Sequence, residues 1–248
     1  MPSSRGAHPE DPSLFAPSKR PTLRAAVRDL SWLRTQGYGD NAAQTLVGDH
    51  YRLTRRQRNA VGRSACGDVE AAHRRVRRRR LPALAGEWLE IDGFNVLITL
   101  EGALGDAYSF IGRDGAYRDV NPVQGTYRPV DDTDRAIRLI RTAALRHGLR
   151  GLVWRLDDHV SNVGRVKQRL DAHRLDGLAC RIRGQDQVDR ALVEAARPVA
   201  TSDSGVLDEV QRWCALEPAA VAGLSAEPTV CDLRPPEGPG GRVGRPGL

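Results

Sequence analysis

The sequence predicts an α/β domain, built as an αβα sandwich with a mainly parallel sheet, preceded by a small all-α module. Residues 22–80 place apolar side chains at the three- and four-residue spacing of helices. From residue 87 onward, short apolar runs alternate with helical stretches, which is typical of βα units around a parallel sheet. The 248 residues are enough for one full domain, a small one and a buried core.

The first module is expected to contain three short helices that follow a leader. Residues 1–21 carry proline, serine and charge without periodicity, so we expect them to be a disordered leader. Apolar residues at helical spacing begin at Leu23. Asp40 can cap a second helix and Thr54 a third. We therefore place a compact, basic helical module at residues 22–80.

Positive charge is concentrated in the first third of the chain. Residues 1–86 hold 17 Lys+Arg and 7 Asp+Glu, a net charge of +10, whereas residues 87–248 hold 21 and 24, a net charge of −3. Such asymmetry favours a polyanionic partner such as nucleic acid. Six of seven consecutive positions are arginine, namely Arg74, Arg75, Arg77, Arg78, Arg79 and Arg80. Because such a block cannot pack in a core, we expect a solvated helix face, a linker or a phosphate-binding arm.

The second domain, residues 87–232, is expected to alternate strands with helices. The apolar runs that predict strands are residues 88–91, 152–156, 178–182 and 198–201. The stretches that predict helices are residues 136–147, 163–173, 188–196 and 206–214. Residues 105–131 are weakly patterned and predict a hairpin or long loop, and the glycine- and proline-rich tail, residues 233–248, is expected to be disordered.

Aspartates follow three of the predicted strands: Asp92, Asp157 and Asp203. The carboxyl ends of parallel strands lie at one edge of a sheet, so we expect these side chains to converge there. Asp158 and Asp208 would complete the cluster or position a water molecule. Clustered carboxylates repel one another unless a cation lies between them, and hard oxygen ligands suit Mg²⁺ or Mn²⁺. Such a centre supports phosphodiester cleavage.

Each of these residues also has a purely structural interpretation. An aspartate after a strand is often a turn former or a helix cap. Asp134 begins the helix predicted from residue 136, where capping competes with a place in the site. Asn95 could orient Asp92 or a water molecule, or cap the helix that follows. Arg165 could contact the scissile phosphate or be an ordinary surface arginine.

Several classes of protein are disfavoured by missing motifs. The chain has no phosphate-binding Gly-rich loop, no dinucleotide fingerprint and no Gly-x-Ser-x-Gly elbow. No apolar run approaches the ~18 residues of a membrane span, and the first residues lack the apolar core of a signal peptide. Four widely separated cysteines form no Cys-x-x-Cys pair, which disfavours a zinc site and predicts reduced thiols in a cytoplasm.

Three short motifs carry a resemblance to a known class of enzymes. Ile91-Asp92-Gly93-Phe94-Asn95-Val96, Asp157 at the end of a later strand, and Thr201-Ser202-Asp203 resemble the motifs of PIN-like and NYN-type ribonucleases, over roughly residues 87–215. The resemblance implies a PIN-like αβα sandwich, a divalent-metal site and RNA as substrate. It implies that Asp92, Asp157 and Asp203 bind the metal and that Asn95 and Ser202 support them. The ribonuclease pattern also has an acidic residue on a helix after the first strand, and this sequence has no clear match to it. Glu101 is the candidate for that position. Without such a residue, the domain would be inactive and would only bind nucleic acid.

The N-terminal module carries a second resemblance. Arg28-Asp29-Leu30, Leu46-Val47-Gly48-Asp49 and Arg56-Gln57-Arg58 resemble the family catalogued as domain of unknown function 434. In that family a small helical module precedes a PIN-like domain that contains runs like Ser161-Asn162-Val163-Gly164-Arg165. The resemblance therefore implies the same two-part organisation for this chain.

These observations predict a cytoplasmic, Mg²⁺- or Mn²⁺-dependent nuclease that acts on RNA and holds the phosphate backbone with its basic module. Alternatives are a non-catalytic nucleic-acid-binding protein on the same fold, a phosphatase or nucleotide-processing enzyme that uses the same carboxylates, and a regulatory partner protein. Convergence of the carboxylates on one metal position would favour catalysis. A closed pocket at the site would favour small substrates, whereas an open groove would favour nucleic acid.

Overall fold

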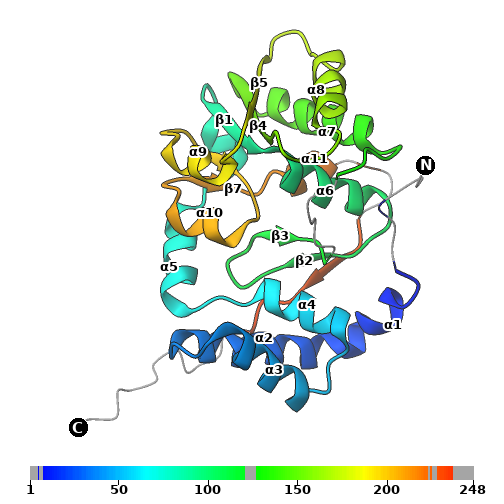
Figure 1. Cartoon of the computed structure of the whole chain (residues 1–248), viewed down its shortest axis with the longest axis vertical. Helices are drawn as coiled ribbons and strands as arrows, with labels where there is room; N and C mark the ends of the chain where they lie inside the picture. The colour runs from blue at the N-terminus through cyan, green and yellow to red at the C-terminus, as the bar shows by residue number, and fades with distance from the viewer. Residues whose placement is uncertain (1–4, 6–7, 121–126, 223, 225–227, 237–248) are drawn as a thin grey trace.

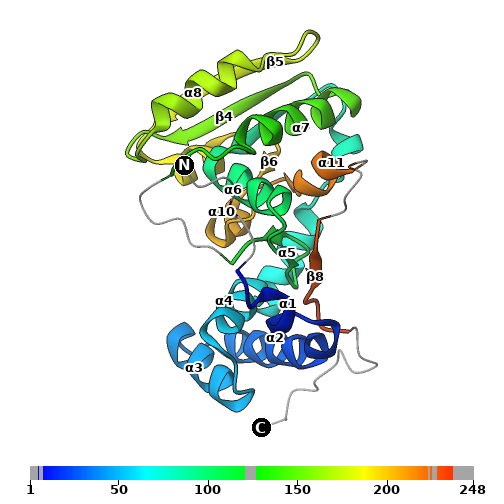
Figure 2. The same cartoon turned by 90° about the vertical axis from the view of Figure 1, so that its right-hand side faces the viewer.

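The computed structural model of the chain describes residues 5, 8–120, 127–222, 224 and 228–236. An all-helical N-terminal part lies at one end of the molecule and an α/β domain at the other, with a small sheet between them (Figures 1 and 2). No helix in these described ranges is long and apolar enough to cross a membrane.

The helical part contains one helix more than the sequence predicts. Its main helices are α2 (Arg20–Thr35), α3 (Asp40–His50), α4 (Arg55–Ser64) and α5 (Asp68–Arg77). Thr54 caps α4 in a reciprocal pair, because its hydroxyl accepts from the Gln57 N–H at 3.3 Å while the Gln57 side chain accepts from the Thr54 N–H at 3.1 Å. The apolar face of α2 packs against α3 and α4. Helix α5 carries the first half of the arginine block.

The segment predicted to be a disordered leader is ordered wherever the structure describes it beyond residue 7. It forms α1 (Asp11–Leu14) and a 3₁₀ turn, Pro17–Lys19. Phe15 is fully buried and meets Phe110 with ring centroids 4.7 Å apart. Asp11 is buried in an ion pair with Arg56, whose Nη2 donates at 2.8 Å. A single aromatic side chain has no periodicity, so only its distant partners reveal that this segment folds.

The small sheet joins the two ends of the molecule. Strands β2 (Ser109–Ile111) and β3 (Tyr117–Arg118) form the hairpin expected within residues 105–131, of which residues 121–126 lie outside the described ranges. Strand β8 (Val230–Asp232) adds in parallel to β2. Leu233 is fully buried in the core of the helical part, so the expected disordered tail does not begin there, and residues 237–248 lie outside the description.

The large sheet is five-stranded and parallel throughout. Its order is β5-β4-β1-β6-β7. The strands are β1 (Trp88–Asp92), β4 (Gly151–Asp157), β5 (Ala179–Gln185), β6 (Val199–Ala200) and β7 (Trp213–Cys214). The helices are α6 (Gly93–Leu104), α7 (Thr133–Arg146), α8 (Val163–Ala172), α9 (Val188–Glu194), α10 (Ser204–Glu209) and α11 (Glu217–Val221). Strand β7 lies in the stretch predicted as one helix, because the apolar residues 206–214 fit a short helix followed by a buried strand equally well.

Helices cover the two faces of this sheet in the order that the chain dictates. Leu89, Ile91 and Trp154 point to the face that packs against α6, α7 and α8. Val199 and Trp213 point to the other face and pack against α9 and α10. The chain places its strands first on one side of β1 and then on the other, so the order reverses between β1 and β6. Open α/β sheets bind ligands at such a switch point, beyond the carboxyl ends of the strands.

Candidate active site at the carboxyl edge of the sheet

The three aspartates that follow predicted strands all lie at the carboxyl edge. Asp92 is the last residue of β1 and Asp157 the last of β4. Asp92 pairs in register with Arg155, which places Asp157 two residues further along the same edge. Asp203 follows β6, the neighbour of β1 on its other side. The topology thus brings these three residues to the switch point between β1 and β6.

Asp92 is the most enclosed of these carboxyl groups. It is 8% exposed, and the Thr201 hydroxyl donates to its Oδ2 at 2.7 Å. Burial raises the pKa of Asp92 to about 7. The hydrogen bonds from Thr201 and from the backbone of Asn95 lower this pKa, whereas the negative charges of Asp189 and Asp203 raise it. Asp92 therefore lies close to the negative charges of Asp189 and Asp203, and no described residue forms an ion pair with it.

Asp189 is a member of this cluster that the sequence did not suggest. It lies in the first turn of α9, which packs over β1 and β4. Partial burial raises the pKa of Asp189, and the charges of Asp203 and Asp157 raise it further. An acidic residue in the first turn of a helix is ordinarily explained by the helix dipole. The only local signal was its position, just after a strand end and one helix before Asp203.

The loop after β6 is held by side-chain hydrogen bonds. The Asp203 Oδ1 accepts from two backbone N–H groups in the first turn of α10, at 2.8 and 3.1 Å. The Thr201 hydroxyl accepts from the Asp203 N–H at 3.0 Å. The Asn95 Oδ1 accepts from the Ser202 hydroxyl at 2.5 Å and from the Ser202 N–H at 3.3 Å. Asn95 and Ser202 therefore tie the start of α6 to this loop.

Asp157 and Asp203 each keep one oxygen atom for another partner. Asp157 uses Oδ1 to accept from the His159 N–H at 2.8 Å. Within the described residues, the second carboxylate oxygens of Asp157 and Asp203 accept no hydrogen bond. In the same part of the chain, no group of three or more His, Cys, Asp or Glu side chains is arranged so as to hold a metal ion.

Gly93 allows α6 to start directly against β4. A Cβ atom at this position would lie 2.7 Å from the Arg155 carbonyl oxygen and 2.5 Å from the Leu156 Cδ2. The backbone carbonyl cannot move aside without disturbing β4. A larger residue would therefore push Asp92 and Asn95, on either side of Gly93, out of place.

A second buried carboxyl group lies near Asp92. Glu217, at the start of α11, is 5% exposed, and its Oε1 has no hydrogen-bond partner among the described residues. Burial raises the pKa of Glu217 to about 7, and the charge of Asp92 adds to this effect. Glu217 follows the carboxyl end of β7, where the sequence suggested no strand.

Two other predicted site residues form ion pairs elsewhere. Asp158 accepts from the Lys167 Nζ at 2.6 Å. Asp134 lies 3.4 Å from the Arg169 guanidinium and 3.1 Å from the His173 imidazole. The structure does not bring either residue into contact with Asp92. Glu101, the candidate acid of α6, is likewise engaged at a distance from the site: it is fully buried and accepts from the Thr133 hydroxyl at 2.5 Å.

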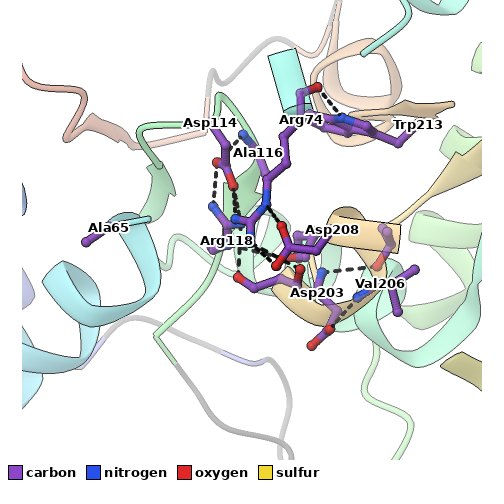
Figure 3. A network of polar contacts seen from close by, with 12 residues as sticks. Ala65, Arg74, Asp114, Ala116, Arg118, Asp203, Val206, Asp208 and Trp213 are labelled. Atoms are coloured by element: carbon purple, nitrogen blue, oxygen red, sulfur yellow. Dashed lines mark hydrogen bonds and ion pairs between the residues drawn. The ribbon is translucent and has the colours of Figure 1, made fainter. Parts of the chain in front are cut away.

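Asp208 belongs to a buried ionic network. Its carboxylate accepts from the Arg74 Nε at 2.7 Å and from its Nη2 at 2.8 Å. Arg74 and Arg118 converge on Asp114, with nitrogen–oxygen distances of 2.7 and 2.6 Å (Figure 3). Burial alone would raise the pKa of Asp114, but the charges of Arg118 and Arg74 hold it well below its usual range. Asp208 is thereby placed opposite an arginine and not opposite Asp92.

This network holds the loop that carries Asp203. The Arg118 Nε donates to the Ser202 carbonyl at 3.1 Å, and the Arg74 Nη2 donates to the Ser204 carbonyl at 3.2 Å. Arg74 comes from α5, and Arg118 comes from the hairpin. The helical part and the small sheet therefore support the candidate site from behind.

The arginine block differs from the expectation that it cannot pack in a core. Arg74 is only 3% exposed because two carboxylates neutralise it. Arg77 donates to the Asp208 carbonyl at 2.7 Å, Arg78 lies 5.3 Å above the Trp213 ring, and Arg79 donates to backbone carbonyls. Among the arginines predicted to bind nucleic acid, Arg75, Arg80 and, on α8, Arg165 are exposed and form no side-chain hydrogen bond, ion pair or ring contact within the described residues.

Comparison with known proteins identifies two adjoining matches. The family model described as "Domain of unknown function (DUF5616)" matches residues 81–219, and "Protein of unknown function (DUF434)" matches residues 22–77. The resemblance of the N-terminal module to the second is confirmed, whereas nothing supports the PIN-like or NYN-type resemblance. The uncharacterized protein MJ0935 of Methanocaldococcus jannaschii is 27% identical over 190 residues, which cover 75% of this chain and 89% of that protein. No solved structure matches the chain.

Proposed function

The chain belongs to the family described as domain of unknown function DUF5616, and we propose that it is a Mg²⁺- or Mn²⁺-dependent nuclease that cleaves RNA. The observation that carries the proposal is the placement of Asp92, Asp157 and Asp203 at the carboxyl edge of the sheet, with Asp189 close enough for its charge to act on Asp92. A PIN-like relationship is part of the proposal. The parallel sheet with acidic residues at its carboxyl edge supports it.

The chemistry of these donors fits a hard divalent cation. Carboxylate oxygens are the ligands that Mg²⁺ and Mn²⁺ prefer. None of the four aspartates forms an ion pair with a described residue, so a cation would relieve the repulsion that adds to burial in raising the pKa of Asp92 and Asp189. Binding would require side chains to rearrange, since the described carboxylates do not form a ready-made group, and Asp189 is exposed. When bound, such a cation acidifies a water molecule and stabilises charge on the leaving oxygen.

The residues around the aspartates have separate tasks in this proposal. Thr201 directs the Asp92 Oδ2, and Asn95 and Ser202 fix the loop that follows β6. Asp203 remains anchored through Oδ1 while its other oxygen is free to act as a ligand. Hydrogen bonds thus fix the site on the β6 side, whereas the exposed side chain of Asp189 can change its conformation.

RNA as the substrate is supported by charge and by motif. The first 86 residues carry a net charge of +10, which suits a polyanion. The strand-end residues Asp92, Asp157 and Asp203 resemble those of PIN-like and NYN-type ribonucleases. We place the protein in the cytoplasm, a proposal that the four unpaired cysteines support.

The test compares charge removal inside and outside the cluster. Asp189→Asn and Asp203→Asn should each lower cleavage of RNA in Mg²⁺ or Mn²⁺ by at least about 10- to 100-fold. Losses of that size occur even when a residue that only hydrogen-bonds to a metal ligand is replaced. Asparagine also caps helices, so α10 should persist in the second variant. Asp176→Asn, at an exposed aspartate between α8 and β5, is the matched control and should cleave like the wild type.

The substrates should separate the alternatives. Single-stranded RNA, duplex RNA, single-stranded DNA and a mononucleotide are compared with and without a chelator. If the protein cleaves only the mononucleotide, and does so only with the cation, its activity would be that of a phosphatase and not of a nuclease. Full cleavage by both cluster variants, or no cleavage by the wild type in either cation, would overturn the proposal.

A further inference from the structure

The sheet face that carries Asp92 also carries several arginines on its β4 and β5 side. Parallel pairing places Asp92, Arg155 and Arg183 in one row across β1, β4 and β5. Two residues earlier, Glu90, Val153 and Arg181 form the preceding row. Contacts agree with this register, because Arg155 donates to Glu90 at 2.7 Å and Arg181 lies 4.3 Å above the ring of Trp88. The alternate residues of the same strands form the hydrophobic core on the opposite face.

Strand β5 is the uncovered edge of this polar face. Helices α9 and α10 pack against β1, β4, β6 and β7, whereas α8 lies on the opposite, hydrophobic face of the sheet. Figure 2 shows β5 at the free edge of the sheet. Arg181 and Arg183 are both exposed there. A row of arginines on an open strand is therefore available to a partner.

The charge of this surface is mainly uncompensated. We define the β5 arginine strip as Arg155, Arg181, Arg183 and Arg197. Glu90 is its one paired carboxylate, fully buried and bound by Arg155 at 2.7 Å and by Arg197 at 2.8 Å. Arg181 and Arg183 form no ion pair with any residue in the described ranges. Three of these arginines are exposed: Arg197 shares Glu90 with the half-buried Arg155, whereas Arg181 and Arg183 have no carboxylate partner within the described residues.

The strip leads directly to the aspartate cluster. Gln185, at the end of β5, is level with Asp157, and Arg183 is two residues before it. Side chains two residues apart on a parallel strand are about 6.6 Å apart along it. This spacing resembles that of successive phosphates in an extended single strand. Arginine also suits phosphate oxygens because its planar guanidinium can donate two parallel hydrogen bonds.

We propose that the β5 arginine strip binds the phosphate backbone of single-stranded RNA and leads the scissile phosphate to the aspartates. Arg183 and Arg181 hold the two phosphates next to the cleavage position. Arg181 and Arg183 lie along one strand and would follow one backbone, which favours a single strand over a duplex. The inference rests on the proposed nuclease function, and it moves the RNA contact from the arginine block, largely engaged in the fold, to the edge of the sheet.

The experiment measures binding without cleavage. Fluorescence anisotropy follows a labelled oligouridine RNA, in a chelator, over a series of salt concentrations. The double variant Arg181→Ala/Arg183→Ala should reduce the slope of log K against log salt by about 1.4, because each contact to a single strand contributes about 0.7. Arg75→Ala/Arg80→Ala removes the same charge from the arginine block and should leave the slope unchanged. Arg181→Lys/Arg183→Lys keeps the charge and should retain most of the slope.

The outcomes separate this inference from the proposed activity. An unchanged slope in the Arg181/Arg183 alanine variant would assign these arginines to protecting the edge strand from aggregation and overturn the inference. A loss confined to the Arg75/Arg80 variant, tighter binding of duplex than of single strands, or no binding by the wild type would overturn it too. Strip-dependent binding without cleavage in Mg²⁺ or Mn²⁺ would uphold the RNA surface and remove only the nuclease.

Discussion

At the scale of single residues, the buried carboxyl groups determine how the molecule responds to pH. Asp92 and Glu217 have a pKa raised to about 7, with burial as the main cause in both. In the unfolded chain both groups lose their protons near pH 4. Between about pH 4 and 7 the folded state therefore binds more protons than the unfolded state. The stabilisation is complete below pH 4 and is lost as the pH rises through 7.

The free energy of unfolding should consequently fall between about pH 4 and 7 when no divalent cation is present, and should level off above pH 7. For Asp92, a pKa raised from 3.8 to about 7 corresponds to at most about 4 kcal/mol. Asp92→Asn should remove part of this fall and raise the melting temperature at pH 8, by about 2–4 °C for each kcal/mol. Thermal melts in a chelator across this range check it, with Asp176→Asn as the control. An equally steep fall in Asp92→Asn would contradict the assigned pKa.

At the scale of elements, α5 and the β2–β3 hairpin hold the loop after β6. Arg118 reaches from the hairpin to Asp114 at 2.6 Å and to the Ser202 carbonyl at 3.1 Å. Arg74 reaches from α5 to Asp114 and Asp208. Asp114 is 6% exposed, so it depends on both arginines for compensation of its charge. The network couples three elements that have no common periodicity in the sequence.

Arg118→Ala should lower the free energy of unfolding by about 3–5 kcal/mol, because breaking a buried ion pair leaves a buried charge without its partner. Arg190→Ala is the matched control, since the Arg190–Glu194 pair spans one turn of α9 with side chains 71% and 62% exposed. Its loss should cost less than about 1 kcal/mol. Urea denaturation of both variants provides the measurement. Equal, small costs would mean that Arg118 does not support the loop.

At the scale of the whole molecule, the N-terminal part and the small sheet share one hydrophobic core. Phe15, from the segment before α2, packs with Phe110 of β2 and with Cys231 of β8 in that core. The same hairpin carries Arg118, which contacts the loop after β6 of the α/β domain. The helical part and the α/β domain are therefore connected by packing as well as by the chain.

Phe15→Ala should destabilise the protein by about 3–5 kcal/mol, the cost of removing a buried aromatic ring and leaving a cavity. Trp32→Ala is the matched control, because Trp32 is 51% exposed on the outer side of α2. Its effect should remain within about 0.5 kcal/mol. Equilibrium unfolding in urea checks both variants. If Phe15→Ala leaves the free energy of unfolding unchanged, residues 8–19 would instead be the disordered leader that the sequence predicts.

The sequence by itself determined the all-helical N-terminal part, the parallel α/β domain and the carboxyl edge as the place where aspartates gather. Periodicity reveals these features because it records which side of each local element is apolar. Thr54 as a cap and Asp92, Asp157 and Asp203 at strand ends follow from local sequence alone.

Only the tertiary structure decided which charged residues meet. Asp189 joins the cluster because α9 folds over β1, and Asp208 leaves it because Arg74, 134 residues away, binds it. An arginine side chain can lie in solvent, or it can be buried where carboxylates pair with it. The presence of an arginine in the sequence therefore does not reveal whether it is exposed or buried. The same holds for Phe15, whose burial depends on a strand almost a hundred residues later. Apolar periodicity is a property of a segment, whereas the partner of a charge or of a lone ring is a property of the whole fold.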